Sequence, residues 1–275
     1  MTQQQIGFIG GGNMASSLIG GLVSNGYPAE KITVSDLDAE KRTYLSDTFG
    51  VTALEDSASV AALADILVLA VKPQVMQSVA ISIRASVQKK KPVVVSIAAG
   101  IRVDALERWL GEGLAVVRCM PNTPALVKTG ATGLYANAQV DDNQKDQVES
   151  LLRAVGVTVW VSSENDLDAV TALSGSGPAY FFMVMEALEE AAIAAGLDPK
   201  VAQLLTQETA LGSAKMALES SESAGVLRQR VTSPGGTTER AIGVLEEKGL
   251  KDIFHQAVLA AKQRSVELSD ELGKS

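Results

Sequence analysis

The 275-residue chain is long enough for one large domain or two ordinary ones, and 46% hydrophobic residues suffice for a full core. A formal net charge of −8 without a basic patch argues against nucleic acid as a partner. The single cysteine, Cys119, excludes an intrachain disulfide and a thiolate metal cluster. We therefore predict no metal site and expect Cys119 to be a small core residue.

The least polar segments do not predict export or a membrane span. The N-terminal residues lack the basic segment of a secretion signal, and no uncharged apolar run is long enough to cross a bilayer. We expect a cytoplasmic protein without a membrane partner, and we predict that stretch 169–187 is a helix buried in protein. The single histidine, His255, is expected to be partly exposed on a helix, so catalysis should proceed without histidine or cysteine.

Strand and helix patterns alternate through the first part of the chain. Strands are predicted at 5–9, 31–35, 65–71, 92–97 and 114–119. Helices are predicted at 13–25, 39–48, 57–63, 74–85 and 103–110, and a strand pair near 131–135 and 157–160 flanks a helix at 142–155. The later strands are nearly continuous apolar runs, typical of parallel strands buried on both faces. This order predicts an α/β fold with a doubly wound parallel sheet of the Rossmann type and right-handed crossovers.

Helical patterns dominate from about Asp166 onward, which predicts domains at 1–164 and 165–275, the second all-α. Asp198 and Pro199 have the residue types of an N-cap and a first helical position. The predicted helices cover 178–196, 199–217, 225–229, the stretch from Gly236 to Gly249, and 251–272. Many small residues lie on these helices and favour close packing, which predicts a homodimer of interwound protomers. A compact monomeric bundle is the alternative.

The strongest motif is the run from Ile6 to Ala15, an apolar strand followed by a Gly-x-Gly-x-x-Ala turn and a helix. This pattern is typical of the corner that binds the pyrophosphate of a dinucleotide. Free amides at the helix start would bind the phosphate. The predicted cofactor-binding residues here are Gly10, Gly11, Gly12, Asn13 and Met14. The alternative is a tight turn that binds nothing.

Three further loops follow predicted strands, at the edge where ligands bind in this fold. Asp36 follows the second strand and is predicted either to accept from the adenosine ribose or to cap the next helix. Lys72 lies in a loop that is predicted either to contact the cofactor or to end a strand in solvent. A third loop has small side chains that suit a flat nicotinamide ring, although packing alone explains it as well. The predicted cofactor-binding residues of these last two loops are Ala70, Val71, Lys72, Pro73, Ala98 and Ala99.

Two further polar loops are candidate binding sites. Met120 to Pro124 contains two prolines, and Asn122 and Thr123 are expected to bond either backbone or ligand. Residues 230–239 form a glycine-rich loop that enters a helix, and the amides of Gly236, Thr237 and Thr238 are predicted to bind an anion. Helix capping by Thr237 is the alternative.

The chain resembles the pyrroline-5-carboxylate reductases. The matching stretches occur in order along nearly the whole chain: 7–14, 70–73, 95–100, 120–124, 174–180 and 233–238. The last two, Ser-Gly-Ser-Gly-Pro-Ala-Tyr and Ser-Pro-Gly-Gly-Thr-Thr, are the most specific.

The resemblance implies reduction of 1-pyrroline-5-carboxylate to proline with NADPH or NADH, and a helical domain that interlocks with a partner subunit, with dimers that often form decamers. It implies that Ser233 and the amides of Gly236, Thr237 and Thr238 hold the substrate carboxylate. It also implies that the Thr238 hydroxyl contacts the ring nitrogen, so Ser233 and Thr238 are the expected catalytic residues. The acid at Asp36 departs from many members and leaves the choice of NADPH or NADH open.

Two other functions fit the layout. A 3-hydroxyacid dehydrogenase would need a lysine followed one helical turn later by asparagine, but Lys215 is followed by Glu219. A nucleotide-binding sensor would bind the cofactor without turnover.

Overall fold

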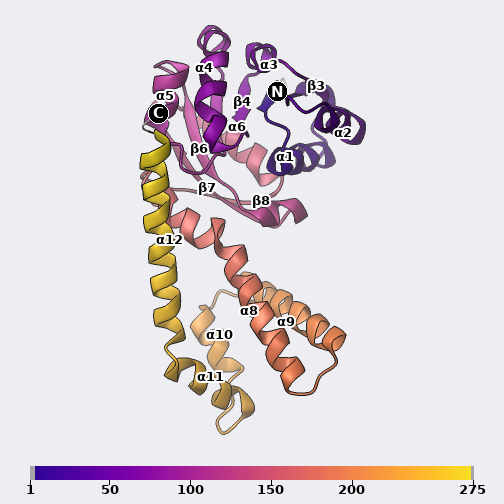
Figure 1. Ribbon diagram of the computed structural model, residues 1–275, viewed down its shortest axis with the longest axis vertical. Helices are drawn as coiled ribbons and strands as arrows, with labels where there is room; N and C mark the ends of the chain where they lie inside the picture. Colours follow the sequence, from indigo (N-terminus) through magenta and orange to yellow (C-terminus); the bar gives the residue numbers. More distant parts are fainter. Residues whose placement is uncertain (1–3, 274–275) are drawn as a thin grey trace. The chain divides into compact units, whose positions relative to one another are not determined.

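The computed structural model describes residues 4–273, which form two compact units (Figure 1). The first unit contains the residues through Ser176 and the chain from Ala260 onward, and the second contains 177–259. This division differs from the domain boundary predicted at 164/165, because the segment before Ser176 and the end of the last helix group with the sheet. The boundary at 164/165 stays a prediction.

An eight-stranded sheet forms the centre of the first unit, in the order β3-β2-β1-β4-β5-β6-β7-β8. The strands are β1 (Ile6–Ile9), β2 (Ile32–Ser35), β3 (Thr52–Leu54), β4 (Ile66–Leu69), β5 (Val93–Ser96), β6 (Val116–Met120), β7 (Gly130–Ala136) and β8 (Gly156–Trp160). The connection from β6 to β7 holds only a 3₁₀ turn (Thr123–Val127), so β7 returns antiparallel to β6. The expectation of a wholly parallel sheet is wrong at this one pairing, and the Rossmann-type fold is confirmed.

Helices cover both faces of this sheet and create two cores. They are α1 (Asn13–Ser24), α2 (Ala39–Phe49), α3 (Ser57–Leu63), α4 (Pro73–Lys90), α5 (Val103–Leu110), α6 (Asp142–Arg153) and α7 (Asp166–Val170). Phe8 of β1 packs in one core with Leu18 of α1, whereas Ile9 packs in the other with Met76 of α4. Burying one such side chain stabilises the fold by about 1.5–3 kcal/mol. The alternation along β1 thus holds helices on both faces.

The second unit consists of helices (Figure 1). They are α8 (Gly177–Ala194), α9 (Pro199–Glu219), α10 (Ala224–Arg230), α11 (Thr237–Glu247) and the start of α12 (Leu250–Gly273). Asp198 caps α9 by accepting from the amides of Lys200 and Val201, with Pro199 at the first position, as predicted. Helices α8 and α9 lie side by side.

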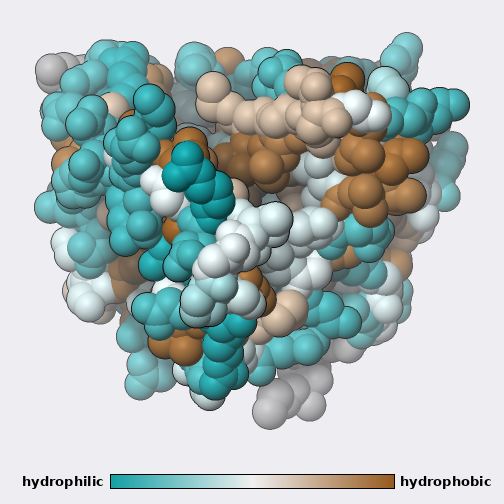
Figure 2. Space-filling view, turned by 90° about the horizontal axis from the view of Figure 1, so that it is seen from below, coloured by the Kyte–Doolittle hydropathy of each residue, from teal (hydrophilic) through white to brown (hydrophobic). Residues whose placement is uncertain are grey.

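Much of the apolar surface of α8 and α9 is exposed in the single chain. Phe181, Phe182 and Leu204 are 68%, 65% and 59% exposed, and apolar side chains also stand open on the face viewed in Figure 2. Within residues 177–259, only Gly177, Ala202 and Thr206 are buried. The prediction that stretch 169–187 is buried in protein therefore holds for Ala172 and Gly177, whereas the residues on α8 are mostly exposed in the single chain. No helix among residues 4–273 combines the length and apolarity that crossing a membrane requires.

Candidate active site

The glycine corner begins directly after β1. Gly10 has φ +98°, and its amide donates to the carbonyl of Ser35 at 2.7 Å. A Cβ at Gly10 would lie 2.7 Å from the carbonyl oxygen of Ala70. Gly10 is therefore required by the protein itself, for the left-handed backbone and the close approach to the end of β4.

Gly12 has a different reason to be glycine. It is the N-cap of α1 with an ordinary φ of −74°, and no side chain caps this helix start. A Cβ there would meet nothing within 4 Å. Space next to Asn13 and Met14 is thus left for a ligand, where first-turn amides lack partners within the helix. A phosphate fits such a site, so these residues fit a dinucleotide.

Asp36 reaches the same corner from the end of β2. Its carboxylate accepts from the amide of Gly11 at 2.8 Å and from the amide of Asp38 at 2.9 Å. Asp38, and not Asp36, caps α2. The ammonium of Lys41 lies 3.7 Å from the Asp36 carboxylate, whose side chain is 14% exposed. The helix-cap alternative for Asp36 is therefore excluded, and its carboxylate lies beside the glycine corner.

The remaining predicted cofactor loops lie at the same edge of the sheet. The amide of Ala70 donates to the carbonyl of Ile9 at 2.8 Å, and the amide of Ile97 donates to the carbonyl of Leu69 at 3.2 Å. Lys72 is exposed at the N-cap of α4, with Pro73 at the first helical position. Ala98 is buried and Ala99 partly buried. All the predicted cofactor residues thus follow the carboxyl ends of four neighbouring strands.

The loop after β6 contains a contact that the sequence did not reveal. Asn122 accepts from the amide of Ala131 at 2.9 Å and donates to the carbonyl of Ser174 at 3.1 Å. Ser174 lies in a π-helical turn (Thr171–Gly175), and a Cβ at Gly175 would lie 2.6 Å from the methyl group of Met120. Asn122 thus bonds backbone, which is one of its two predicted alternatives. The glycines of the Ser-Gly-Ser-Gly stretch were the available signal for this close packing.

Buried ion pairs surround the end of β6 and also escaped the sequence reasoning. Arg118 is 3% exposed and lies 3.0 Å from Glu164, which accepts from the amide of Val103 at 2.8 Å.

A second buried charge lies on α7. Asp168 is 1% exposed, lies 3.2 Å from the guanidinium of Arg102, and accepts from the hydroxyl of Ser265 at 2.7 Å. Each buried charge thus has a partner, and the contacts join β6 to the segment before α7 and join α7 to α12.

The predicted anion loop lies in the second unit. Gly235 has φ +72° and donates to Glu239 at 2.7 Å, and the amide of Gly236 donates to the carbonyl of Ser233 at 3.0 Å. Gly236 is the N-cap of α11 without a side-chain cap, so capping by Thr237 is wrong. Ser233 and Thr237 are exposed and Thr238 is partly buried. The amides of Thr237 and Thr238, in the first turn of α11, face no partner within the helix.

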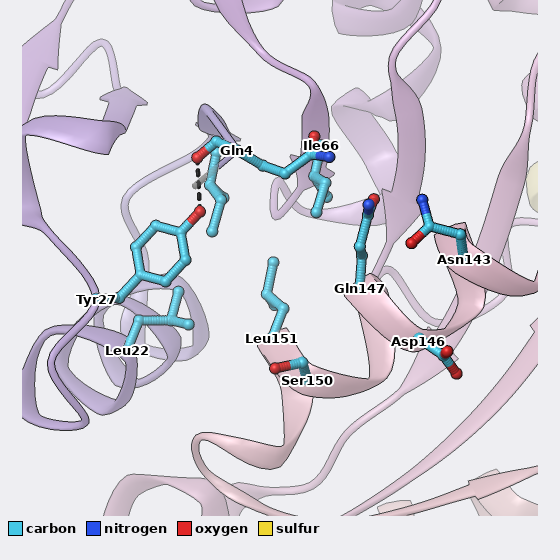
Figure 3. A pocket seen from close by; sticks show the side chains of 10 residues that line it. Gln4, Leu22, Tyr27, Ile66, Asn143, Asp146, Gln147, Ser150 and Leu151 are labelled. Atoms are coloured by element: carbon cyan, nitrogen blue, oxygen red, sulfur yellow. Dashed lines mark hydrogen bonds between the residues drawn. The ribbon is translucent and has the colours of Figure 1, made fainter. Parts of the chain in front are cut away.

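A hollow of about 360 Å³ lies at the opposite, amino edge of the strands (Figure 3). Ile6 and Ile66 form part of its wall, and the Tyr27 hydroxyl donates to the carbonyl of Gln4 at 2.6 Å. Burial, and secondarily the charge of Asp65, raises the pKa of Tyr27. None of the predicted site residues lines this hollow.

The side chains of Cys119, His255 and Lys215 are not among the predicted site residues. Cys119 is buried, and burial raises the pKa of its thiol, so it is a core residue as predicted. His255 is exposed on α12. Lys215 is 70% exposed and lies 3.9 Å from Glu219. Among residues 4–273, no cluster of three or more histidine, cysteine or acidic side chains is placed to hold a metal.

Comparison with known proteins identifies the family. Residues 164–268 match the family "Pyrroline-5-carboxylate reductase dimerisation", and residues 5–100 match "NADP oxidoreductase coenzyme F420-dependent". The chain is 50% identical over 274 residues to the pyrroline-5-carboxylate reductase of Pseudomonas aeruginosa, covering 100% of both chains.

Solved structures agree with this comparison. The Coxiella burnetii pyrroline-5-carboxylate reductase has a TM-score of 0.94 at 47% identity, covering 98% of this chain and 99% of that one. The Plasmodium falciparum pyrroline carboxylate reductase with NADP bound has a TM-score of 0.86 at 29% identity, covering 98% and 99%. The earlier resemblance is confirmed, and the chain belongs to the pyrroline-5-carboxylate reductase family.

Proposed function

We propose that this protein reduces 1-pyrroline-5-carboxylate to L-proline by hydride transfer from NADPH or NADH to the carbon of the C=N bond. This is the final step of proline synthesis. The observation that carries the proposal is the open cradle at Gly12, where a phosphate fits, in a chain whose relatives are named for this reaction. NADPH or NADH, when bound, supplies the hydride.

The first unit holds and orients the cofactor. First-turn amides of α1, at Asn13 and Met14, bind the pyrophosphate. The loop 70–73 lines its path, and Ala98 and Ala99 leave room for the flat nicotinamide ring close to the backbone. Metal chemistry has no part in this proposal, since a protonated cyclic imine is already electrophilic.

The loop of Ser233 and α11 holds the substrate. The Ser233 hydroxyl and the amides of Gly236, Thr237 and Thr238 bind the carboxylate, for which the Gly236 amide exchanges its bond to the Ser233 carbonyl. The Thr238 hydroxyl orients or protonates the ring nitrogen. Hydride transfer requires the iminium carbon to lie about 3–3.5 Å from the hydride donor, and such positioning can supply most of the rate enhancement.

Asp36 sets the balance between the two cofactors in this proposal. Its carboxylate favours the ribose hydroxyls of NADH and repels the extra phosphate of NADPH, and the exposed Lys41 next to it offsets part of that repulsion. The enzyme therefore uses both cofactors. A relative with NADP bound supports NADPH use.

The exposed apolar faces of α8 and α9, within the region that matches the dimerisation family, support a homodimer through the helical unit. We further propose that dimers assemble into decamers and that the enzyme works in the cytoplasm.

A spectrophotometric assay tests the function. The absorbance of each reduced cofactor is followed with pyrroline-5-carboxylate and then with the oxidised products of 3-hydroxyacids. Turnover with the cyclic imine alone is expected. Turnover of the 3-oxo acids would favour a 3-hydroxyacid dehydrogenase, and cofactor binding without any turnover would favour a sensor.

A further inference from the structure

One buried hydroxyl of the first unit has no hydrogen-bond partner among residues 4–273, that of Ser174. Thr171, one turn earlier, satisfies its own hydroxyl by donating to the carbonyl of Leu167 at 2.7 Å, the usual solution on a helix. Ser174 makes no such bond within the π-helical turn Thr171–Gly175. A buried hydroxyl without a partner is costly, so Ser174 calls for a partner that the chain itself does not supply.

Ser174 lies near the carboxyl edge of the sheet, where the loops with the predicted cofactor-binding residues follow the strands. Its carbonyl accepts from Asn122 at 3.1 Å, and the adjoining Gly175 packs against Met120, the last residue of β6. The pairing of Ser96 with Arg118 places the residues after β5, including Ala98, beside the end of β6. Ser174 is thus anchored at the end of β6, the strand next to β5, whose following loop is expected to hold the nicotinamide ring.

We propose that the Ser174 hydroxyl hydrogen-bonds the carboxamide group of the nicotinamide ring. This proposal rests on the proposed function. A carboxamide offers both a donor and an acceptor, and a serine hydroxyl pairs with either. Asn122 is held by backbone, since its side-chain oxygen accepts from the Ala131 amide and one of its two N–H groups donates to the Ser174 carbonyl. π-helical turns often occur at functional sites, which agrees with a binding role for this one.

Binding measurements on the full-length Ser174→Ala variant test the proposal. Dissociation constants are measured by calorimetry for NADPH, for NADH and for ADP-ribose, which lacks the nicotinamide. The variant should bind both reduced cofactors about five- to tenfold more weakly, the effect of one lost hydrogen bond, and ADP-ribose unchanged. Its thermal midpoint should not fall, because no bond within the protein is lost.

Ser269→Ala is the matched control, since this buried hydroxyl donates to the carbonyl of Ser265 at 3.0 Å. It should lower the thermal midpoint and leave all three constants unchanged. If Ser174→Ala fails to fold, Ser174→Cys keeps nearly the same volume with a weaker donor and should show the same pattern.

Three results would overturn the proposal: unchanged binding of both reduced cofactors, an equal loss for ADP-ribose, or a higher KM for the imine with unchanged cofactor binding. Failure of the proposed function is separate. It would appear in the unmodified protein as cofactor binding without turnover of the imine.

Discussion

The carboxylate of Asp36 accepts a hydrogen bond from the backbone amide of Gly11 at 2.8 Å, so the acid that follows β2 helps to shape the glycine corner. Asp36 therefore has two tasks, and substitutions separate them. Asn keeps an acceptor for the Gly11 amide and removes the charge, whereas Ala removes both.

We predict that Asp36→Asn raises the ratio of kcat/KM for NADPH to kcat/KM for NADH by about tenfold, because the like charge near the extra phosphate is gone. Steady-state kinetics with both cofactors measure this ratio. Asp36→Ala should change the ratio similarly and also weaken binding of both cofactors. An unchanged ratio in both variants would remove Asp36 from cofactor selection.

The two glycines of the corner should respond oppositely to alanine. Gly12→Ala should leave the thermal midpoint unchanged, since the new methyl group meets nothing within 4 Å, and weaken cofactor binding by about tenfold or more, since it fills the phosphate cradle. Gly10→Ala should lower stability by about 1–3 kcal/mol, because its backbone is left-handed and the new methyl group would clash. Thermal melts and calorimetry check both. A destabilised Gly12→Ala would contradict the reading of that site.

Thr238→Ala should lower kcat by roughly ten- to a hundredfold through loss of a positioning hydrogen bond to the ring nitrogen. Thr238→Ser keeps the hydroxyl and should retain most activity. Cofactor dissociation constants should be unchanged in both variants. Equal kinetics for Thr238→Ala and the unmodified enzyme would exclude this role.

A charge on the exposed face of α8 should disrupt assembly. Phe182 is 65% exposed in the single chain, so Phe182→Glu should shift the protein toward monomer in light scattering after gel filtration. Leu63 on α3 is 56% exposed in the first unit and is the matched control; Leu63→Glu should keep the unmodified molecular mass. The same mass for both variants would place the interface elsewhere.

Asp65 should give a pH-dependent contribution to stability. Desolvation raises its pKa, but the bond from Lys90 at 2.7 Å and the Gln5 amide outweigh this and bring the pKa below its ordinary 3.8. A lowered pKa in the folded state stabilises the fold above the unfolded-state pKa, and this contribution disappears as pH falls through the folded value. Because the pair is partly exposed, its contribution is only about 0.5–1 kcal/mol. Urea unfolding should show that Asp65→Asn is less stable at pH 7, with the difference shrinking below about pH 4. A constant difference across this range would contradict the assignment.

Sequence reasoning worked where a pattern has one physical cause. The helix 57–63 and the cap at Asp198 are as predicted, because side chains one to three residues away decide them. Strand β3 was missed because it has only three residues, none of them buried, and no apolar run. The direction of β7 depends on the absence of a crossover helix after β6, and the length of that connection was the available signal.

Prediction of the candidate site from the sequence was limited in the same way. The predicted strand ends placed the expected cofactor loops at one edge of the sheet. The bonds of Asp36 to Gly11 and of Asn122 to Ser174 join residues far apart in the chain, which no local pattern encodes. The buried pairing of Asp168 with Ser265 is of the same kind.

The pairing of Asp168 with Ser265 affects when the first unit can fold during synthesis. Asp168 is synthesised long before Ser265, 97 residues later in the chain, and the guanidinium of Arg108 bonds a carbonyl 165 residues further on. On the ribosome, the nucleotide-binding half therefore has to wait for the last helix before its final contacts close. Such late, long-range closure is slow and leaves the emerging chain open to misassembly.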